Sequence, residues 1–431
     1  MTSHVAPPSP TAAQSPHADA AAAGAATGDR RPGLAIISNT ITPYRVNLHR
    51  LIAAGIPELK LHTLTTHGDA DFKWAVDVPG SIHASYFNRP GDSPLASTWR
   101  APVWEWRKGG RLINYLRAND VRAVICQGYR YISYLRVIRY CHRHGIPRFV
   151  RNDSNIHNER RLPPVKQWVK RRVYAGWMPL VSGVMSMGGC GDEFFLKYGA
   201  RPEHIYRVPY TPDYDYFAAA DADRLERFRR KVGLRDDHKY VLFCGRLAPV
   251  KRVDLLIDAF AAIAAQRPDW DLLVVGDGIL GDELRSRVPD HLRQRVVWTG
   301  FLETEESVLA YHAAEVLALP SDMEPWALVV QEAMAAGLAV VASDVVGAAR
   351  ELVQDGTSGR MFPAGDVDAL RQALLDVTQD NATSQYQQRS RDALRDWRER
   401  INPVEEVRRA MADVGVLDTC RTPASVATKP A

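Results

Sequence analysis

The stretch that decides the fold runs from Ser321 to Gly337 and reads Ser-Asp-Met-Glu-Pro-Trp-Ala-Leu-Val-Val-Gln-Glu-Ala-Met-Ala-Ala-Gly. A short apolar run, Val316 to Leu319, precedes it and has the character of a buried strand. Within the stretch a polar loop leads to a helical pattern. We predict that Pro325 lies in the first turn of this helix, where the fixed φ of proline is tolerated. A strand, a loop and a helix in this order are typical of an α/β domain.

Two carboxylates, Glu324 and Glu332, lie eight residues apart in this stretch. In a continuous helix, eight residues make two full turns and about 80° more. One carboxylate is then expected at the helix entrance and the other about two turns further along. This would suit an extended polar ligand whose anionic group lies near the helix N-terminus. An amphipathic helix with two solvated acids explains the same pattern equally well.

The alternation of strands and helices recurs along the chain. Apolar runs predict strands at Leu34–Ser38, Leu61–Thr66, Ile82–Phe87, Val121–Cys126, Arg148–Arg151, Gly183–Met187, Ile205–Val208, Tyr240–Gly245, Asp271–Gly276, Arg295–Thr299, Val316–Leu319 and Ala339–Ala342. Helical patterns lie at Gly110–Ala118, Ile132–His144, Arg252–Gln266, Leu280–Val288, Glu305–Ala313, Pro325–Ala336, Val345–Val353 and Pro403–Asp413. We therefore predict an α/β protein with two Rossmann-like lobes that face each other across a cleft.

Composition shifts suggest where the parts begin and end. The first residues are rich in Ala, Pro, Ser and His, without the pattern of a signal peptide, and Pro, Asp and Tyr cluster between Pro209 and Ala222. The predicted parts are a disordered tail (1–32), a first lobe on the acceptor side (33–210), a linker (211–222), a second lobe on the donor side (223–395), a C-terminal helix that crosses back to the first lobe (396–418) and a flexible tail (419–431).

The net charge of +5 over 431 residues conceals a division. Between Gly33 and Tyr210 there are 26 Lys and Arg against 12 Asp and Glu, whereas from Thr211 onward there are 27 against 36. A basic lobe of this kind suits an anionic membrane surface, a phosphorylated ligand or nucleic acid. No helix-turn-helix or zinc pattern supports the last, so no nucleic acid is expected.

The chain is expected to be cytoplasmic. Its five cysteines are scattered and odd in number, as in a reduced protein, and no apolar run approaches the ~20 residues that span a bilayer. The segment from Leu162 to Met178 interleaves four basic residues with Trp168, Tyr174 and Trp177. Such a helix can lie on the inner face of the plasma membrane, or it can simply cover the sheet with its basic side chains turned to solvent.

Cations and glycines follow two strands of the second lobe. Arg246 and Lys251 stand on the loop before a helix, where two fixed cations suit a diphosphate. Gly276 and Gly278 follow the next strand, where glycine lets a ligand approach the backbone, although a tight turn also explains them. Each signal is weak alone, and their shared position at strand ends is what favours a site.

Four motifs occur in order at family spacing: Gly245-Arg246-x4-Lys251, Val275-Gly276-Asp277-Gly278, Glu324-Pro325-Trp326-x5-Glu332-Ala333-Met334-Ala335-Ala336-Gly337 and Asp355-Gly356-x2-Gly359. Together they resemble the family 4 retaining glycosyltransferases, which have the GT-B fold. The resemblance is specific from about Tyr240 to Val377 and weaker in the first lobe.

The resemblance implies a role for each matching residue. Arg246 and Lys251 would bind the diphosphate of a nucleotide sugar and neutralise the leaving group, so that no metal or other cofactor is needed. Glu324 would contact hydroxyls of the transferred sugar, and Glu332 would bind the ribose hydroxyls.

The remaining donor-side residues follow from the same likeness. Gly276, Gly278, Trp326, Ala327 and Leu328 would line the donor, with backbone amides ahead of Leu328 on the phosphate. Trp326-Ala327 departs from the Phe-Gly that is common in the family.

The first lobe matches less clearly. The histidine common in the family is not clearly placed; Asp153 is the preferred catalytic residue beside the sugar, with His157 as the alternative, and either residue is equally ordinary as a helix cap or loop residue. Thr40 and Thr42 are assigned to the diphosphate side of the first-lobe loop, or to a plain turn. Gln127 and Tyr129 are assigned to the acceptor side.

The resulting hypothesis is a retaining hexosyltransferase whose catalytic residues are Asp153, Glu324, Arg246 and Lys251. It would use a UDP- or GDP-linked donor and a saccharide or lipid-linked acceptor in polysaccharide or glycoconjugate assembly. The alternatives are a sugar phosphorylase, a nucleotide-sugar epimerase, or a non-catalytic protein that binds nucleotide sugars or polyanions.

Overall fold

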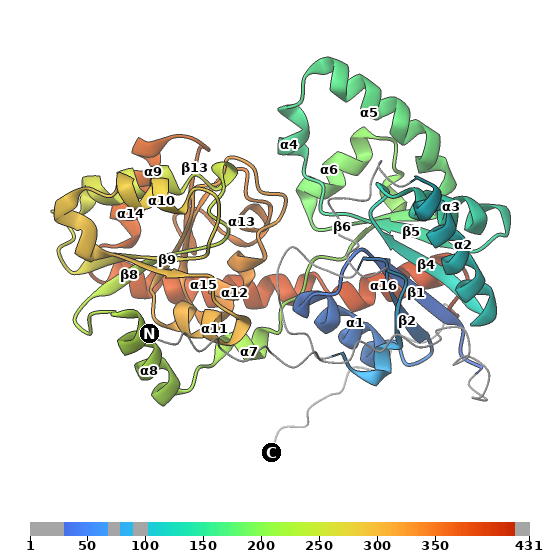
Figure 1. Cartoon of the computed structure of the whole chain (residues 1–431), viewed down its shortest axis with the longest axis horizontal. Helices are drawn as coiled ribbons and strands as arrows, with labels where there is room; N and C mark the ends of the chain where they lie inside the picture. The colour runs from blue at the N-terminus through green and yellow to red at the C-terminus, as the bar shows by residue number, and fades with distance from the viewer. Residues whose placement is uncertain (1–29, 68–77, 89–101, 419–431) are drawn as a thin grey trace, which may run out of the picture.

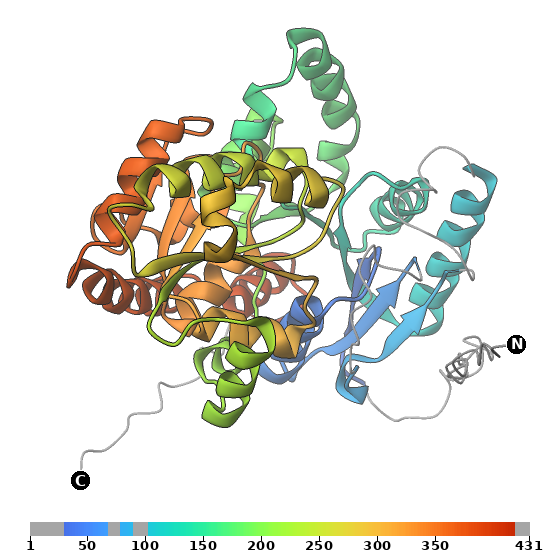
Figure 2. The same ribbon diagram turned by 60° about the vertical axis from the view of Figure 1, so that its left-hand side comes forward.

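The computed structural model describes residues 30–67, 78–88 and 102–418. It consists of two α/β lobes that lie side by side (Figures 1 and 2). Most of the predicted N-terminal tail and the predicted tail from residue 419 lie outside the described residues.

The first lobe is built on a parallel sheet with the strand order β3-β2-β1-β4-β5-β6-β7. Its strands are β1 (Gly33–Ser38), β2 (Lys60–Thr65), β3 (Ala84–Tyr86), β4 (Val121–Gln127), β5 (Arg148–Arg151), β6 (Gly183–Ser186) and β7 (Ile205–Arg207). Strands β1 and β6 are buried along their whole length, as expected for a sheet covered on both faces.

Helices cover both faces of this sheet. They are α1 (Pro43–Gly55), α2 (Pro102–Ala118), α3 (Ile132–Arg143), α4 (Ile156–Arg160), α5 (Pro164–Trp177) and α6 (Gly189–Lys197). Buried side chains of α2, α3, α5 and α6 form one apolar cluster, and those of α1 form another on the opposite face. In both views α5 stands at the outer end of the lobe (Figures 1 and 2).

The second lobe repeats the architecture with the strand order β10-β9-β8-β11-β12-β13. Its strands are β8 (Lys239–Cys244), β9 (Trp270–Val275), β10 (Val296–Gly300), β11 (Val316–Leu319), β12 (Ala339–Ser343) and β13 (Gly359–Phe362). Its helices are α8 (Ala222–Val232), α9 (Val253–Ile263), α10 (Gly281–Arg287), α11 (Thr304–His312), α12 (Leu328–Ala336), α13 (Gly347–Leu352), α14 (Val367–Val377) and α15 (Ala382–Arg400). One large apolar cluster fills this lobe.

The chain crosses between the lobes twice. The first crossing follows β7 and includes the short helix α7 (Tyr214–Ala218), which lies inside the predicted linker. The second joins α15 to α16 (Pro403–Asp413), which returns to the first lobe and packs against α1 and β7 (Figure 1).

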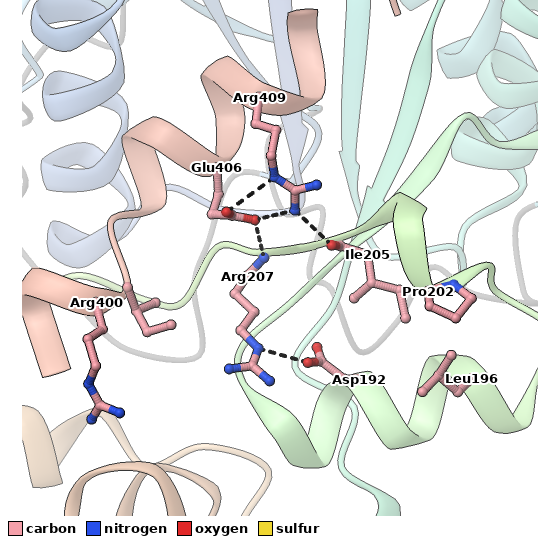
Figure 3. A pocket seen from close by; sticks show the side chains of 9 residues that line it. Asp192, Leu196, Pro202, Ile205, Arg207, Arg400, Glu406 and Arg409 are labelled. Atoms are coloured by element: carbon pink, nitrogen blue, oxygen red, sulfur yellow. Dashed lines mark hydrogen bonds and ion pairs between the residues drawn. The ribbon is translucent and has the colours of Figure 1, made fainter. Parts of the chain in front are cut away.

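Polar contacts fix α16 where it meets β7 (Figure 3). The Glu406 carboxylate accepts hydrogen bonds from the Arg207 backbone N–H at 3.1 Å and from Arg409 Nη2 at 2.7 Å. Arg409 Nη2 also donates to the Ile205 carbonyl at 3.0 Å. The predicted return of the C-terminal helix therefore takes place on the outer strand of the first sheet.

One helix prediction is wrong, and several helices, including α6, α8, α14 and α15, were not predicted. Helix α12 begins at Leu328, so Pro325 lies in the loop before it. Helix α15 does not appear among the predictions, because its sequence is mostly polar and only a narrow stripe including Ala393, Leu394 and Trp397 is buried. Among the described residues, every helix is too short or too polar to cross a bilayer.

Candidate active site

A cleft of about 1020 Å³ lies between the lobes. Side chains of α1 line one side, the first crossing closes one end, and the carboxyl ends of β8, β9 and β10 line the other side together with α12. In parallel α/β sheets this edge is where ligands bind. Of the residues predicted from sequence, Arg246, Gly276, Gly278, Leu328 and Glu332 line the cleft.

The loop before α12 differs from the predicted helix. Ala327 adopts φ 73°, in the left-handed region, which costs an alanine about 1 kcal/mol. Glu324 lies before this turn, outside the helix, whereas Glu332 lies within it. The predicted offset of two helical turns between the carboxylates is therefore wrong. The first backbone N–H groups of α12 follow Ala327, and this N-cap residue has no side chain that could cap them. Leu328 and Val329 bring that N-terminus to the cleft, where it favours an anion.

Glu324 forms an ion pair with Lys251. Both side chains are largely buried, with 11% and 23% of their surface exposed. Each ion therefore neutralises the other. Arg246, by contrast, is exposed and lines the cleft on the loop that follows β8.

The glycines of this edge are required by the packing of two loops. A Cβ at Gly276 would lie 1.9 Å from the Gly245 carbonyl oxygen, and φ at Gly276 is 131°. A Cβ at Gly278 would lie 2.4 Å from the Leu247 carbonyl oxygen. The loops after β8 and β9 are joined further by the Leu247 N–H, which donates to the Asp277 carbonyl at 2.9 Å. The absence of a Cβ at Gly276 and Gly278 thus allows the two loops to pack backbone against backbone, and both glycines lie at the cleft surface.

Glu332 points from α12 towards the same edge of the sheet. Its Oε2 accepts a hydrogen bond from the Tyr311 hydroxyl at 2.7 Å. Burial raises the pKa of Glu332 to about 7, and the bond from Tyr311 opposes this rise. A carboxylate held in this way can accept two hydroxyl donors, as a ribose presents them.

Trp326 does not line the cleft. Its ring is 3% exposed and packs near Trp397, with the ring centroids 6.2 Å apart. The indole therefore belongs to the core beneath the loop before α12, residues 320–327, which we call the donor loop after its predicted role. The prediction that Trp326 contacts the donor directly finds no support in this geometry.

The first-lobe segment after β5 reaches the donor loop. Asn155 Nδ2 donates to the Pro325 carbonyl at 3.3 Å, and this contact places Asp153 and Glu324 on touching segments. Asp153 Oδ2 accepts from the Tyr210 hydroxyl at 3.4 Å. His157 lies on α4. Its partial burial is the main cause that lowers its pKa, and the nearby guanidinium of Arg350 lowers the pKa further. Neither Asp153 nor His157 is among the cleft-lining residues.

The other first-lobe candidates lie away from the cleft wall. Thr40 accepts hydrogen bonds from Arg45 through its carbonyl at 2.6 Å and its hydroxyl at 3.0 Å, and the Thr42 carbonyl caps the start of α1. These contacts are those of a turn. Tyr129 stacks on Trp177 beneath α5, with 4.8 Å between ring centroids, and Gln127 ends β4.

The cleft also contains residues that the motifs did not indicate. Tyr311 and Cys244 line the cleft with Glu332, and the wall beyond β10 is formed by Phe301, Leu302, Glu303, Thr304 and Ser307. Because the carboxyl ends of parallel strands share one edge, the predicted strand Arg295–Thr299 already indicates that the residues directly after it, Phe301 among them, lie at the cleft.

Comparison with known proteins identifies the second lobe. A family model for glycosyl transferases group 1 matches residues 225–396. The second lobe is a group 1 glycosyltransferase domain. The resemblance drawn from the four motifs is thereby confirmed.

Curated relatives of this glycosyltransferase domain match over a similar region. The chain is 31% identical over 207 residues to the alpha-D-kanosaminyltransferase of Streptomyces kanamyceticus, covering 48% of this chain and 52% of that protein. It is 36% identical over 172 residues to the phosphatidyl-myo-inositol mannosyltransferase of Mycolicibacterium smegmatis, covering 39% and 42%. The chain thus matches about half of each relative's length or less.

Solved glycosyltransferase structures match nearly the whole chain. The Anabaena protein HepE in complex with UDP and glucose superposes with a TM-score of 0.67 at 17% identity, covering 90% of this chain and all of that one. The predicted GT-B fold, with both lobes, is thereby confirmed.

Proposed function

We propose that the chain transfers a hexose-type sugar from a nucleotide diphosphate to a hydroxyl of a saccharide or lipid-linked acceptor, with retention of configuration. The proposal is carried by one observation: Arg246, the N-terminus of α12 and Glu332 line the same cleft. A guanidinium and a helix N-terminus suit the diphosphate, and Glu332 suits the ribose. Lys251 would approach the diphosphate once the sugar hydroxyls take its place beside Glu324.

In this proposal no metal takes part. The positive charge of Arg246, Lys251 and the α12 N-terminus stabilises the leaving diphosphate. Departure of the diphosphate breaks the bond to the anomeric carbon and leaves an oxocarbenium-like centre. The acceptor hydroxyl attacks from the face that the leaving group has vacated, and its proton passes to the departing phosphate oxygen on that face. Asp153, on the first-lobe segment that contacts the donor loop, is assigned beside this centre.

A panel of UDP-, GDP- and ADP-sugars tests the proposal. The matching donor is expected to raise the melting temperature, because it binds the folded state, and to do so equally with and without EDTA. Release of the nucleoside diphosphate should then require an acceptor. Conversion of the donor alone would identify an epimerase, and the absence of any nucleotide-dependent shift would contradict the proposal.

We also propose that the first lobe docks on an anionic membrane. On α5, Val165 is 73% and Trp168 is 59% exposed, although both are large and apolar. Exposed Lys166, Arg171 and Arg172 lie on the same helix. Apolar side chains that enter the headgroup region and cations that attract anionic lipid are the features of an interfacial helix. Such a surface suits a lipid-linked acceptor.

Vesicle binding checks this docking surface. Wild-type protein should sediment with vesicles that contain phosphatidylserine at low ionic strength, and charge reversal of Lys166, Arg171 and Arg172 to glutamate should abolish sedimentation. The matched control changes Arg224, Arg227 and Arg230 on α8 to glutamate, and this variant should still bind the vesicles. Equal loss in both triple variants would mean that only net charge matters, and no binding by wild-type protein would exclude the docking.

A further inference from the structure

Trp326 makes a directed contact from the donor loop. Its Nε1–H donates to Gln331 Oε1 at 2.8 Å, and both side chains are buried. A buried indole N–H needs an acceptor, and here the acceptor is a side chain of the following helix. The contact joins the loop that carries Glu324 to α12.

The Gln331 amide continues the connection to the first crossing between the lobes. Its Nε2 donates to the Tyr210 carbonyl at 3.1 Å and to the Tyr214 hydroxyl at 2.6 Å. The orientation of the amide is fixed by its partners, because an indole N–H can only donate and a carbonyl can only accept. Each polar group of Gln331, which is fully buried, is thus satisfied.

Tyr210 carries the connection into the first lobe. Its hydroxyl donates to Asp153 Oδ2 at 3.4 Å. Its ring contacts Tyr44 edge-on, with 4.8 Å between centroids, and the Arg151 guanidinium lies 4.8 Å from the ring centroid. The backbone of Tyr210 is therefore held by the second lobe, while its side chain is held by the first.

We propose that Trp326 and Gln331 are positioning residues that tie the donor loop to the first crossing and, through Tyr210, set the place of Asp153 relative to Glu324. The placement of Asp153 relative to Glu324 matters only if the proposed function is right, whereas the tie between the donor loop and the first crossing does not depend on it. Trp326 would then affect the reaction by positioning other residues and not by contacting the donor. A core-filling role alone predicts no effect of the indole N–H on the linker.

Replacement of Trp326 by phenylalanine tests the proposal, because it removes the indole N–H together with part of the buried ring system, and Trp397→Phe removes the same atoms elsewhere in the core. In Trp326→Phe, kcat is expected to fall about tenfold while the dissociation constant of the nucleoside diphosphate stays within about twofold, because the buried Gln331 oxygen loses its donor far from the nucleotide. Amide hydrogen exchange of residues 211–217 should become about tenfold faster. Gln331→Met should give at least the same changes, and the double variant should be no worse than Gln331→Met.

The matched control is Trp397→Phe. Trp397 lies in the same core, but its buried indole N–H has no hydrogen-bond partner among the described residues. The Trp397→Phe variant should leave kcat and the amide hydrogen exchange of residues 211–217 within about twofold of wild type. The proposal is overturned if Trp326→Phe behaves like Trp397→Phe, or if it weakens nucleotide binding and leaves kcat unchanged. If no donor of the panel is turned over, the proposed function and the catalytic part fail together, and linker exchange still decides whether the tie exists.

Discussion

Glutamine in place of Glu324 is expected to lower the rate of sugar transfer about 100- to 1,000-fold. The carboxylate is the acceptor that we assign to the sugar hydroxyls, and it neutralises Lys251 in a largely buried ion pair. Glutamine keeps the volume but removes the charge, so the geometry of the reacting sugar is lost while the fold is kept. Nucleotide affinity should change less than about threefold, because Arg246 and Glu332 are untouched. Single-turnover kinetics with saturating donor measure the first quantity, and calorimetry measures the second.

Asp322→Asn provides the control for loss of an ion pair on the same loop. Asp322 pairs with Arg252 at 2.9 Å and carries no assigned catalytic role. Its replacement should change turnover by less than about threefold, as for a partly exposed ion pair. Wild-type turnover in Glu324→Gln would remove Glu324 from the site, and equal losses in both variants would reduce its role to holding the loop.

Glu332→Gln is expected to stabilise the free protein and to weaken nucleotide binding. The Glu332 carboxyl has a pKa of about 7 when folded, against an ordinary value of 4.5. The folded state therefore holds the proton more tightly, and the stability of the wild type falls as the pH rises from about 4.5 to about 7. Glutamine cannot ionise, so the variant avoids this loss, which amounts to about 3 kcal/mol at most above pH 7.

Denaturant titrations at pH 5 and pH 8 measure this difference. The pH dependence should weaken but not vanish, because burial also raises the pKa of Glu315 to about 7. Nucleotide affinity should fall about tenfold at pH 8, where the wild-type carboxylate accepts the ribose hydroxyls. Wild-type affinity should itself weaken below pH 7 as Glu332 is protonated. A variant no more stable than wild type at pH 8, or one with unchanged affinity, would contradict the assignment.

The fold could be predicted from the sequence because both sheets are parallel and buried. Their strands appear as short apolar runs, and β5 and β11 begin and end at the predicted residues. Helix α15 escaped prediction because a helix that buries one narrow stripe has a polar composition. Strand β13 was missed as well, since Gly359–Phe362 has only two fully buried positions.

The site was predictable where a motif coincides with a strand end. Arg246 and Gly276 follow β8 and β9 directly, so their place at the cleft follows from sheet topology alone. The loop around Pro325 was not predictable, because proline fits a first helical turn and the left-handed Ala327 gives no such signal in an alanine. The acceptors of the Gln331 amide N–H groups, on Tyr210 and Tyr214, lie more than 100 residues away, and no local pattern indicates them.

The return of α16 to the first lobe affects the order in which the protein can fold during synthesis. Val407, Ala410 and Met411 complete the apolar cluster on the α1 face of the first sheet. They leave the ribosome roughly 10 to 40 s after β7, at the usual rates of translation. The second lobe, whose core lies between residues 187 and 397, has all of its parts earlier. The half of the chain that is made first is therefore the last to be completed, and until then its α1 face must be shielded from other chains.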